Sequence, residues 1–148
     1  MTVASLVDTN ILVYCYDPGD PVKREAARRL LRKGAAKDEL RIPHPAMVEF
    51  VNAVTRGRAG GRSLLTREEA WRQAEDLLNE FPVLYPNESV FRTALLGMAA
   101  YKFSWYDAHL WAYAEHFGLP EILSEDFEHG RRYGTVRVRN PFVELALP

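Results

Sequence analysis

Residues 5–14 read SLVDTNILVY, an apolar run that is interrupted by three polar residues, Asp8, Thr9 and Asn10. The residues before Asp8 are small, apolar or β-branched, which favours a strand over residues 3–7. Asp, Thr and Asn are turn-forming, so we expect the strand to end there with Asp8 at its carboxyl end. An Asx turn would explain Asp8 taken alone, so the rest of the chain must show whether its carboxylate has a chemical role.

Helical and strand-like segments alternate through the rest of the chain. Apolar residues at helical spacing predict helices over residues 21–34, 44–57, 66–79, 87–101 and 104–118. Short apolar segments between them predict strands over residues 40–43, 81–86, 119–123 and 135–139. This alternation indicates an α/β domain with a mainly parallel sheet, in which ligands bind beyond the carboxyl ends of the strands. Asp8 is expected to lie at such an end.

The composition is typical of a globular protein, with 148 residues, 47% of them hydrophobic and 26% charged. We expect one domain over residues 1–148. No apolar run reaches the roughly 18–20 residues of a membrane span, and MTVASLVD lacks the basic start of a signal peptide, so we expect a cytoplasmic location without membrane contact. Cys15 is the only cysteine, which excludes a disulfide framework, and the net charge of -1 leaves nucleic-acid contact to local basic patches.

Three more acidic residues occupy positions comparable to that of Asp8. Glu49 lies in the first turns of the helix over residues 44–57, although it could simply be solvated there. Asp107 follows Ser104 by three residues, as in a capping box, but it also shares a helical face with apolar residues, and that helix has no Lys or Arg to pair with it. Asp126 follows the fourth strand, where its neighbour Glu125 could point into the crevice instead.

The set of acids is more informative than any one of them. Two follow strands and two lie near helix starts, namely Asp8, Asp126, Glu49 and Asp107. Clustered carboxylates without a cation would repel one another and raise their own pKa values. Carboxylate oxygens are the ligands that Mg²⁺ and Mn²⁺ prefer. The sequence therefore predicts a site for Mg²⁺ or Mn²⁺.

The segments that carry these acids resemble those of PIN-domain proteins, most closely ribonuclease toxins of the VapC type from type II toxin-antitoxin pairs. The matching segments are VDTNILVY, AMVEFVNAV, SWYDAHLWAYA, ILSEDFEHG and VRNPF. The resemblance implies a three-layer α/β/α fold around a parallel sheet of about five strands in the order 3-2-1-4-5. It also implies a metal-dependent endoribonuclease that hydrolyses RNA phosphodiester bonds, pairs with an antitoxin protein and forms a homodimer.

The same resemblance assigns roles to individual residues. It makes the four acids catalytic and gives them one or two Mg²⁺ or Mn²⁺ ions to hold: Asp8, Glu49, Asp107 and Asp126. Three neighbouring polar residues would support these acids: Thr9, Asn10 and Ser124. One departure is His44-Pro45, where many relatives have Ser or Thr, and we assign His44 no catalytic role.

Basic and aromatic residues near the acids are candidates for RNA contact. They are Arg56, Arg58, Arg62, Trp105 and Tyr106. Exposed Arg side chains are most often only solvated, and aromatic residues early in a helix most often belong to the core. His109 and His116 are expected on the surface.

Other protein classes with acidic sites fit the sequence less well. An aspartic protease needs Asp-Thr-Gly, but Asn10 follows Thr9 here. A receiver domain needs an acceptor Asp after its third strand, where this chain has FPVLYPNES. The remaining alternative is a catalytically silent PIN-like module that binds RNA or protein, and the presence of all four acids argues against it.

Overall fold

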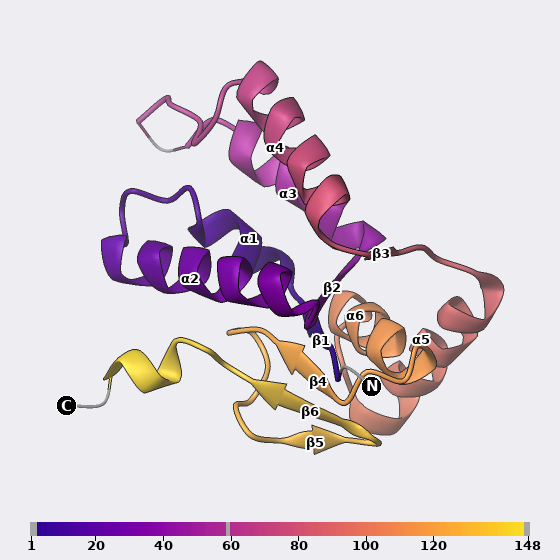
Figure 1. Ribbon diagram of the computed structural model, residues 1–148. Helices are drawn as coiled ribbons and strands as arrows, with labels where there is room; N and C mark the ends of the chain where they lie inside the picture. The colour runs from indigo at the N-terminus through magenta and orange to yellow at the C-terminus, as the bar shows by residue number, and fades with distance from the viewer. Residues whose placement is uncertain (1–2, 59, 147–148) are drawn as a thin grey trace.

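The computed structural model describes residues 3–58 and 60–146, and six strands form one sheet in the order β3-β2-β1-β4-β6-β5 (Figure 1). The strands are β1 (Ser5–Val7), β2 (Leu40–Pro43), β3 (Val83–Leu84), β4 (Glu121–Leu123), β5 (Arg132–Tyr133) and β6 (Val136–Arg139). Neighbouring strands pair in parallel except β5 and β6, which form an antiparallel hairpin. The predicted α/β class and strand order are confirmed, and the short edge strand β5 is an addition.

Helices cover both faces of the sheet. They are α1 (Thr9–Tyr14), α2 (Pro21–Lys37), α3 (His44–Thr55), α4 (Arg67–Glu80), α5 (Glu88–Tyr101) and α6 (Trp105–His116), followed by a 3-10 turn, η1 (Val143–Ala146). Figure 1 shows α1 to α4 on one side of the sheet and α5 with α6 on the other, which confirms the three layers. No helix within the described part of the chain is long and apolar enough to cross a membrane.

The central strands are buried on both faces, so their side chains alternate between two cores. Leu6 packs with residues of α5 and α6, whereas Val7 packs with residues of α1 to α4. Ile122 and Leu123 of β4 divide between the two cores in the same way. Such strands read as continuous apolar runs, which is why they are visible in the sequence.

Helix α1 was not predicted. The strand ends at Val7 as expected, but Asp8 then acts as the N-cap of α1, where its side chain accepts a hydrogen bond from the backbone N–H of Thr9 at 2.7 Å. The apolar residues that follow have strand-forming character, yet they form a helix because Ile11 and Leu12 bury one face of it against the α1 to α4 core.

The prediction that the helix over residues 21–34 ends at Gly34 is wrong. Helix α2 continues to Lys37 and ends at Asp38, which has a left-handed backbone with φ of 54°. Gly34 is buried and lies so close to Leu40 that an added Cβ would collide with the Leu40 side chain. The glycine therefore allows α2 to approach the start of β2.

Candidate active site

The four acids selected from the sequence line one cavity beside the carboxyl ends of β1 and β4. The cavity has a volume of about 200 Å³, and its walls include Asp8, Glu49, Asp107 and Asp126. Val7 and Leu123 pair at the ends of the two parallel strands, so the residues that follow them emerge together. Glu49 comes from α3 and Asp107 from the first turn of α6. Residues more than 100 positions apart in the chain thus meet at one place.

Asp8 forms the floor of this site and is held from two sides. The Ser124 hydroxyl donates a hydrogen bond of 2.6 Å to Asp8 Oδ2, and the Thr9 N–H donates to Oδ1. Burial nevertheless raises the pKa of Asp8 from 3.8 to about 6, because desolvation of the carboxylate outweighs those two hydrogen bonds, and the charges of Asp126 and Glu49 add to it. Asp8 is therefore a carboxylate that lacks a counter-charge.

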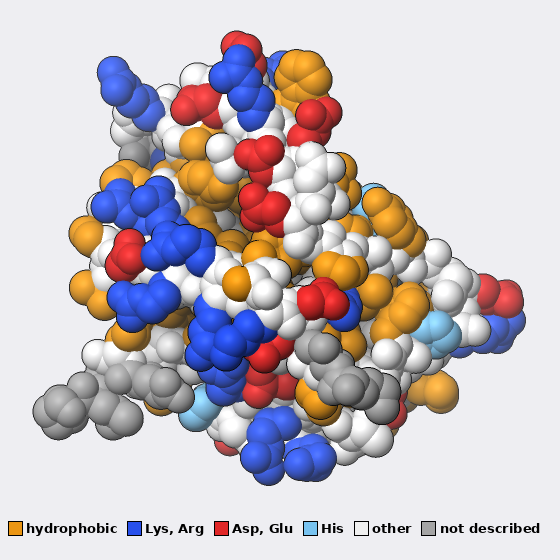
Figure 2. Space-filling model, in the orientation of Figure 1, with side chains coloured by type: hydrophobic (Ala, Val, Ile, Leu, Met, Phe, Trp, Pro, Cys, Tyr) orange, Lys and Arg blue, Asp and Glu red, His pale blue; other side chains and the backbone are white. Residues whose placement is uncertain are grey.

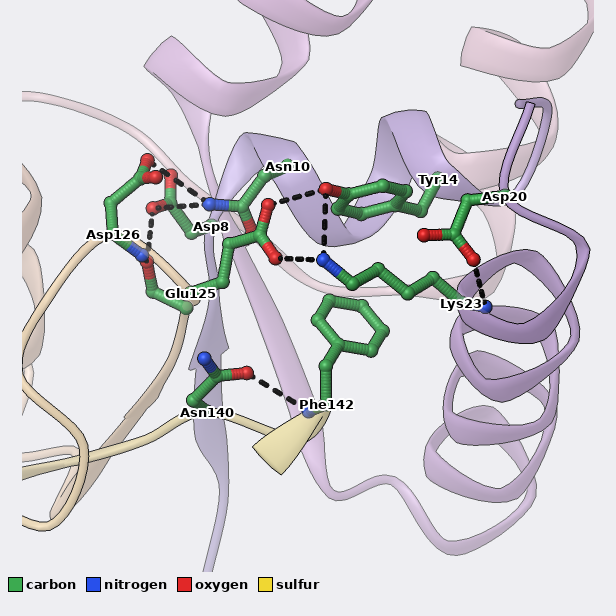
Figure 3. A network of polar contacts seen from close by, with 10 residues as sticks. Asp8, Asn10, Tyr14, Asp20, Lys23, Glu125, Asp126, Asn140 and Phe142 are labelled. Atoms are coloured by element: carbon green, nitrogen blue, oxygen red, sulfur yellow. Dashed lines mark hydrogen bonds and ion pairs between the residues drawn. The ribbon is translucent and has the colours of Figure 1, made fainter. Parts of the chain in front are cut away.

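Two small polar side chains link the other acids to the start of α1. The Thr9 hydroxyl donates to Glu49 Oε2 at 2.8 Å. The Asn10 amide donates to Asp126 Oδ2 at 3.1 Å and to Asp8 Oδ2 at 3.4 Å, as Figure 3 shows. The residues expected to support the acids, Thr9, Asn10 and Ser124, thus each contact at least one of them.

Asp107 lies at the start of α6, opposite the α1 side of the cavity. Its backbone N–H donates to the Ser104 hydroxyl at 3.2 Å, as the predicted helix cap requires. Its carboxyl group is half-buried, and burial raises its pKa, with a smaller contribution from Asp126. Within the described residues, no Lys or Arg forms an ion pair with it. The expectation of an inward-facing acid without a partner matches this geometry.

Glu125 and Asp126 have different surroundings, although they are neighbours in the chain. Glu125 accepts hydrogen bonds from Lys23 Nζ at 2.9 Å and from the Tyr14 hydroxyl at 2.5 Å (Figure 3). Lys23 also lies over the rings of Tyr14 and Phe142. Asp126 instead contacts Asn10 and lines the cavity. Of the two acids that the sequence could not separate, the structure groups Asp126 with the other three.

The donor types in the cavity fit Mg²⁺ or Mn²⁺. Four carboxylates line it, and no Lys or Arg is among its described lining residues. The spacing of the side chains does not itself form a ligand cage, since no three described His, Cys, Asp or Glu residues are close enough to hold a metal ion. The chemistry of the donor set therefore fits a hard divalent cation, and ligation would require some of these side chains to move closer together.

The three arginines proposed for RNA contact differ in their positions. Arg58 lines a groove of about 350 Å³ that shares Asp8, Glu49 and Asp126 with the cavity. Its guanidinium lies 3.6 Å from the carboxylate of Asp17. Arg62 lines a second depression, of about 560 Å³, which shares Arg58 with this groove. Arg56 is exposed and lines neither the groove nor the depression. Of these three arginines, Arg58 is thus the one that lines a groove together with the acids.

Aromatic residues of α6 form the wall near Asp107. Tyr106 lines the cavity and is 74% exposed, whereas Trp105 is half-buried against Phe91 and His109. The prediction that His109 lies on the surface is wrong, because it is half-buried, lines the cavity, and burial lowers its pKa. Exposed His116 agrees with the prediction.

Sequence reasoning also missed Tyr113. This residue is fully buried and lines the cavity, and burial raises the pKa of its hydroxyl to about 12. Its ring centroid lies 5.3 Å from that of His109. Residues 109 and 113 are one helical turn apart, but neither lies three or four positions from Asp107, so helical spacing alone did not group them with this acid.

Comparison with known proteins is consistent with the fold. The family model of the PIN domain matches residues 5–134. Similar solved structures include a toxin-antitoxin complex from Klebsiella pneumoniae (TM-score 0.68, 17% identity, 93% of this chain and 98% of that chain) and DNA-bound VapBC from Salmonella typhimurium (TM-score 0.69, 15% identity, 95% and 99%).

A third similar structure is VapC20 from Mycobacterium tuberculosis, described as a sarcin-ricin loop cleaving toxin (TM-score 0.64, 17% identity, 83% of this chain and 90% of that chain). No curated protein matches the sequence. At these identities the structural neighbours show the fold alone, whereas the domain match spans most of the sequence. The chain therefore belongs to the PIN-domain family.

Proposed function

We propose that this protein is a metal-dependent endoribonuclease and the toxin of a type II toxin-antitoxin pair. The observation that carries the proposal is the convergence of Asp8, Glu49, Asp107 and Asp126 on one cavity that no described Lys or Arg lines. Uncompensated carboxylates with raised pKa values are typical of functional sites. Membership of the PIN family makes phosphodiester hydrolysis the reaction that such a site supports best.

The residues of the chain have distinct tasks in this reaction. Asp8, Glu49, Asp107 and Asp126 would hold one or two Mg²⁺ or Mn²⁺ ions. When bound, such an ion lowers the pKa of a water molecule and offsets charge on the phosphate in the transition state. Asp8 would hold the ion as a carboxylate, while Ser124 and the Thr9 N–H fix the orientation of its two oxygens.

The groove beyond the cavity offers a path for the RNA backbone. Arg58 lines both the groove that contains three of the acids and the neighbouring depression. That depression also contains Arg62 and Arg24. In Figure 2, Lys and Arg side chains gather over the face formed by α2. Cations along this path would hold the phosphates on either side of the bond that the acids hydrolyse, without reading the sequence.

Partners are part of the proposal and depend on the structural neighbours. Two of the similar structures are a toxin-antitoxin complex and a VapBC complex, so we propose an antitoxin as the partner of this chain. We also propose a homodimer and a cytoplasmic location. The alternative function is a catalytically silent PIN-like module, which would bind RNA or protein through the same surface without hydrolysing RNA.

The test is cleavage of purified tRNA, rRNA and mRNA in Mg²⁺ or Mn²⁺ and in EDTA. We expect cleavage only with metal, and loss of cleavage in Asp8→Asn and Asp107→Asn. Asp76→Asn, which changes an exposed acid on α4, is the matched control and should cleave like the wild type. Folded wild type that cleaves none of these RNAs with either metal would favour the binding module instead.

A further inference from the structure

The cavity has a second wall whose chemistry differs from that of the acids. Helix α6 contributes His109, Leu110 and Tyr113 to it, and the junction of β2 and α3 contributes Pro43 and Pro45. These groups are apolar or aromatic surfaces with a few hydrogen-bonding atoms. A cation has no obvious ligand here apart from the imidazole, so this wall suits a different part of the substrate.

The Tyr113 hydroxyl is the most informative atom of this wall. The residue is fully buried, lines the cavity, and its hydroxyl has no hydrogen-bond partner within the part of the chain that the structure describes. A buried hydroxyl without a partner costs free energy, so such groups are uncommon in folded proteins. Tyr113 lines the cavity although its hydroxyl is closed off from solvent, so a small shift of the side chain as a ligand binds would open the hydroxyl and let the ligand supply its missing hydrogen bond.

His109 provides a second hydrogen-bonding group beside that hydroxyl. It lies one helical turn before Tyr113, with ring centroids 5.3 Å apart, and also lines the cavity. Trp105 stacks on the other side of the imidazole at 5.7 Å and 14° between planes, which restricts the orientation of the ring. No hydrogen bond to another described residue occupies the imidazole.

We infer that Tyr113 and His109 form a subsite that hydrogen-bonds one unpaired nucleobase next to the phosphodiester held by the acids. This inference rests on the proposed function, because it takes RNA as the substrate. Bases in single-stranded RNA can turn out of the stack, lie against apolar or aromatic surfaces, and present donors and acceptors along their edges. The cavity is smaller than the roughly 300–1,000 Å³ of drug-sized pockets, which suits one base rather than a base pair.

The proposal predicts selectivity for a base, which a test of binding can measure without any cleavage. RNA hexamers of A, of C and of U carry equal charge, so their phosphate contribution cancels and differences in affinity report on the bases. The protein is full-length Asp107→Asn with Mg²⁺, in which cleavage is expected to be lost. Fluorescence anisotropy of labelled hexamers then gives three dissociation constants for each variant.

We expect one hexamer to bind more tightly than the others in the Asp107→Asn protein. Adding Tyr113→Phe should reduce that preference by about threefold to tenfold, which is the effect of one neutral hydrogen bond. Adding His109→Phe, which retains an aromatic ring, should reduce it similarly. Tyr113→Phe removes only a hydroxyl without a partner, so we expect it to fold normally. Tyr133→Phe, in the same apolar core but outside the cavity lining, is the control and should keep the preference.

Three results would overturn the inference. These are equal affinity for the three hexamers, no measurable binding of any of them, or a preference that survives both Tyr113→Phe and His109→Phe. In the last case the hydroxyl would contact only ordered water. The proposed function fails by a different result, the absence of metal-dependent cleavage by the wild type, so the two failures are distinguishable.

Discussion

Glu125 and Asp126 are adjacent in the chain, but one is paired with a cation and the other faces uncompensated acids. Glu125 accepts hydrogen bonds from Lys23 and Tyr14, and the ion pair joins the loop after β4 to α2. Among the described residues, Asp126 forms hydrogen bonds only with Asn10 and Ser124, and it shares its cavity with three other carboxylates. Figure 3 shows both environments in one view.

The contrast separates structural acids from chemical ones. The bond to Glu125 raises the pKa of Lys23, as expected of a stabilising pair. At the cavity the pKa of Asp8 and of Asp107 is raised by burial, which means that their ionised forms are disfavoured in the folded protein. Acids whose ionised form is disfavoured in this way point to a ligand that supplies positive charge. The predictions below test this difference.

The largest expected effect is on cleavage. Asp107→Asn should reduce the rate by at least about 100-fold, since even residues behind metal ligands typically change affinity or activity by about 10- to 100-fold. Glu125→Gln should retain activity within about tenfold, because Glu125 acts only on the position of its loop. Initial rates on one RNA substrate at saturating Mn²⁺ provide the comparison. Equal losses in the two variants would contradict the separation of the two acids.

The next effect is on stability and depends on pH. Between pH 4 and 6 the folded protein keeps a proton on Asp8 that the unfolded chain has lost, so the free energy of unfolding should fall as pH rises through this range. In Asp8→Asn the side chain cannot ionise, so this fall in the free energy of unfolding is absent. The variant should therefore be more stable than the wild type in the metal-free state at pH 7.5, by up to about 3 kcal/mol. Asn also remains a good N-cap for α1.

Urea unfolding of the wild type and of Asp8→Asn in EDTA at pH 4 and at pH 7.5 measures this effect. The gain in stability should be larger at pH 7.5 and should shrink when Mn²⁺ is added, because the ion binds the wild-type carboxylate. A variant that is destabilised equally at both pH values would show that the Asp8 carboxylate is a structural group.

The ion pair between Lys23 and Glu125 should stabilise the folded protein, so breaking it should lower the free energy of unfolding. Lys23→Met keeps the apolar stem of the side chain but leaves Glu125 without its cation. The side chains of the pair are only 31% and 22% exposed, so the loss should be about 1–2 kcal/mol, above that of a surface pair. Arg32→Met, which breaks an exposed pair with Glu25, should change stability by less than about 0.5 kcal/mol. Thermal unfolding with and without Mn²⁺ should show the same Lys23→Met loss.

The smallest effect concerns the groove. Arg58→Gln should weaken RNA binding and reduce the slope of log affinity against log salt concentration by up to about one. Asp17 already offsets part of the charge of Arg58, so the reduction should be below that of a free arginine. Arg72→Gln on the outer face of α4 is the control. Titrations of one single-stranded RNA at several salt concentrations distinguish the two variants, and identical slopes would remove Arg58 from the RNA path.

Much of the fold could be predicted from the sequence because the strands are short apolar runs between amphipathic helices. Strand order and the position of Asp8 after β1 follow from that pattern together with the family resemblance. Helix α1 was not legible, since Ile11 to Tyr14 favour a strand locally and only burial against other helices makes them helical.

The four acids could be selected from the sequence, but their surroundings depend on distant residues. Lys23, which distinguishes Glu125 from Asp126, is 102 positions from Glu125. His109 and Tyr113 could be placed on a helix, but the cavity they line also needs Pro43 and Pro45 from the other half of the chain. Such pairings are set by tertiary packing, which one sequence does not display.

The most direct test of the central claim is calorimetric titration of Mn²⁺ into the metal-free wild type, Asp8→Asn and Glu125→Gln at pH 7.5. The account predicts that the wild type binds Mn²⁺, that Asp8→Asn binds it at least about tenfold more weakly, and that Glu125→Gln retains wild-type affinity. Equal affinity in the wild type and Asp8→Asn, or no binding by the folded wild type, would contradict the claim that the acids of the cavity form a metal site.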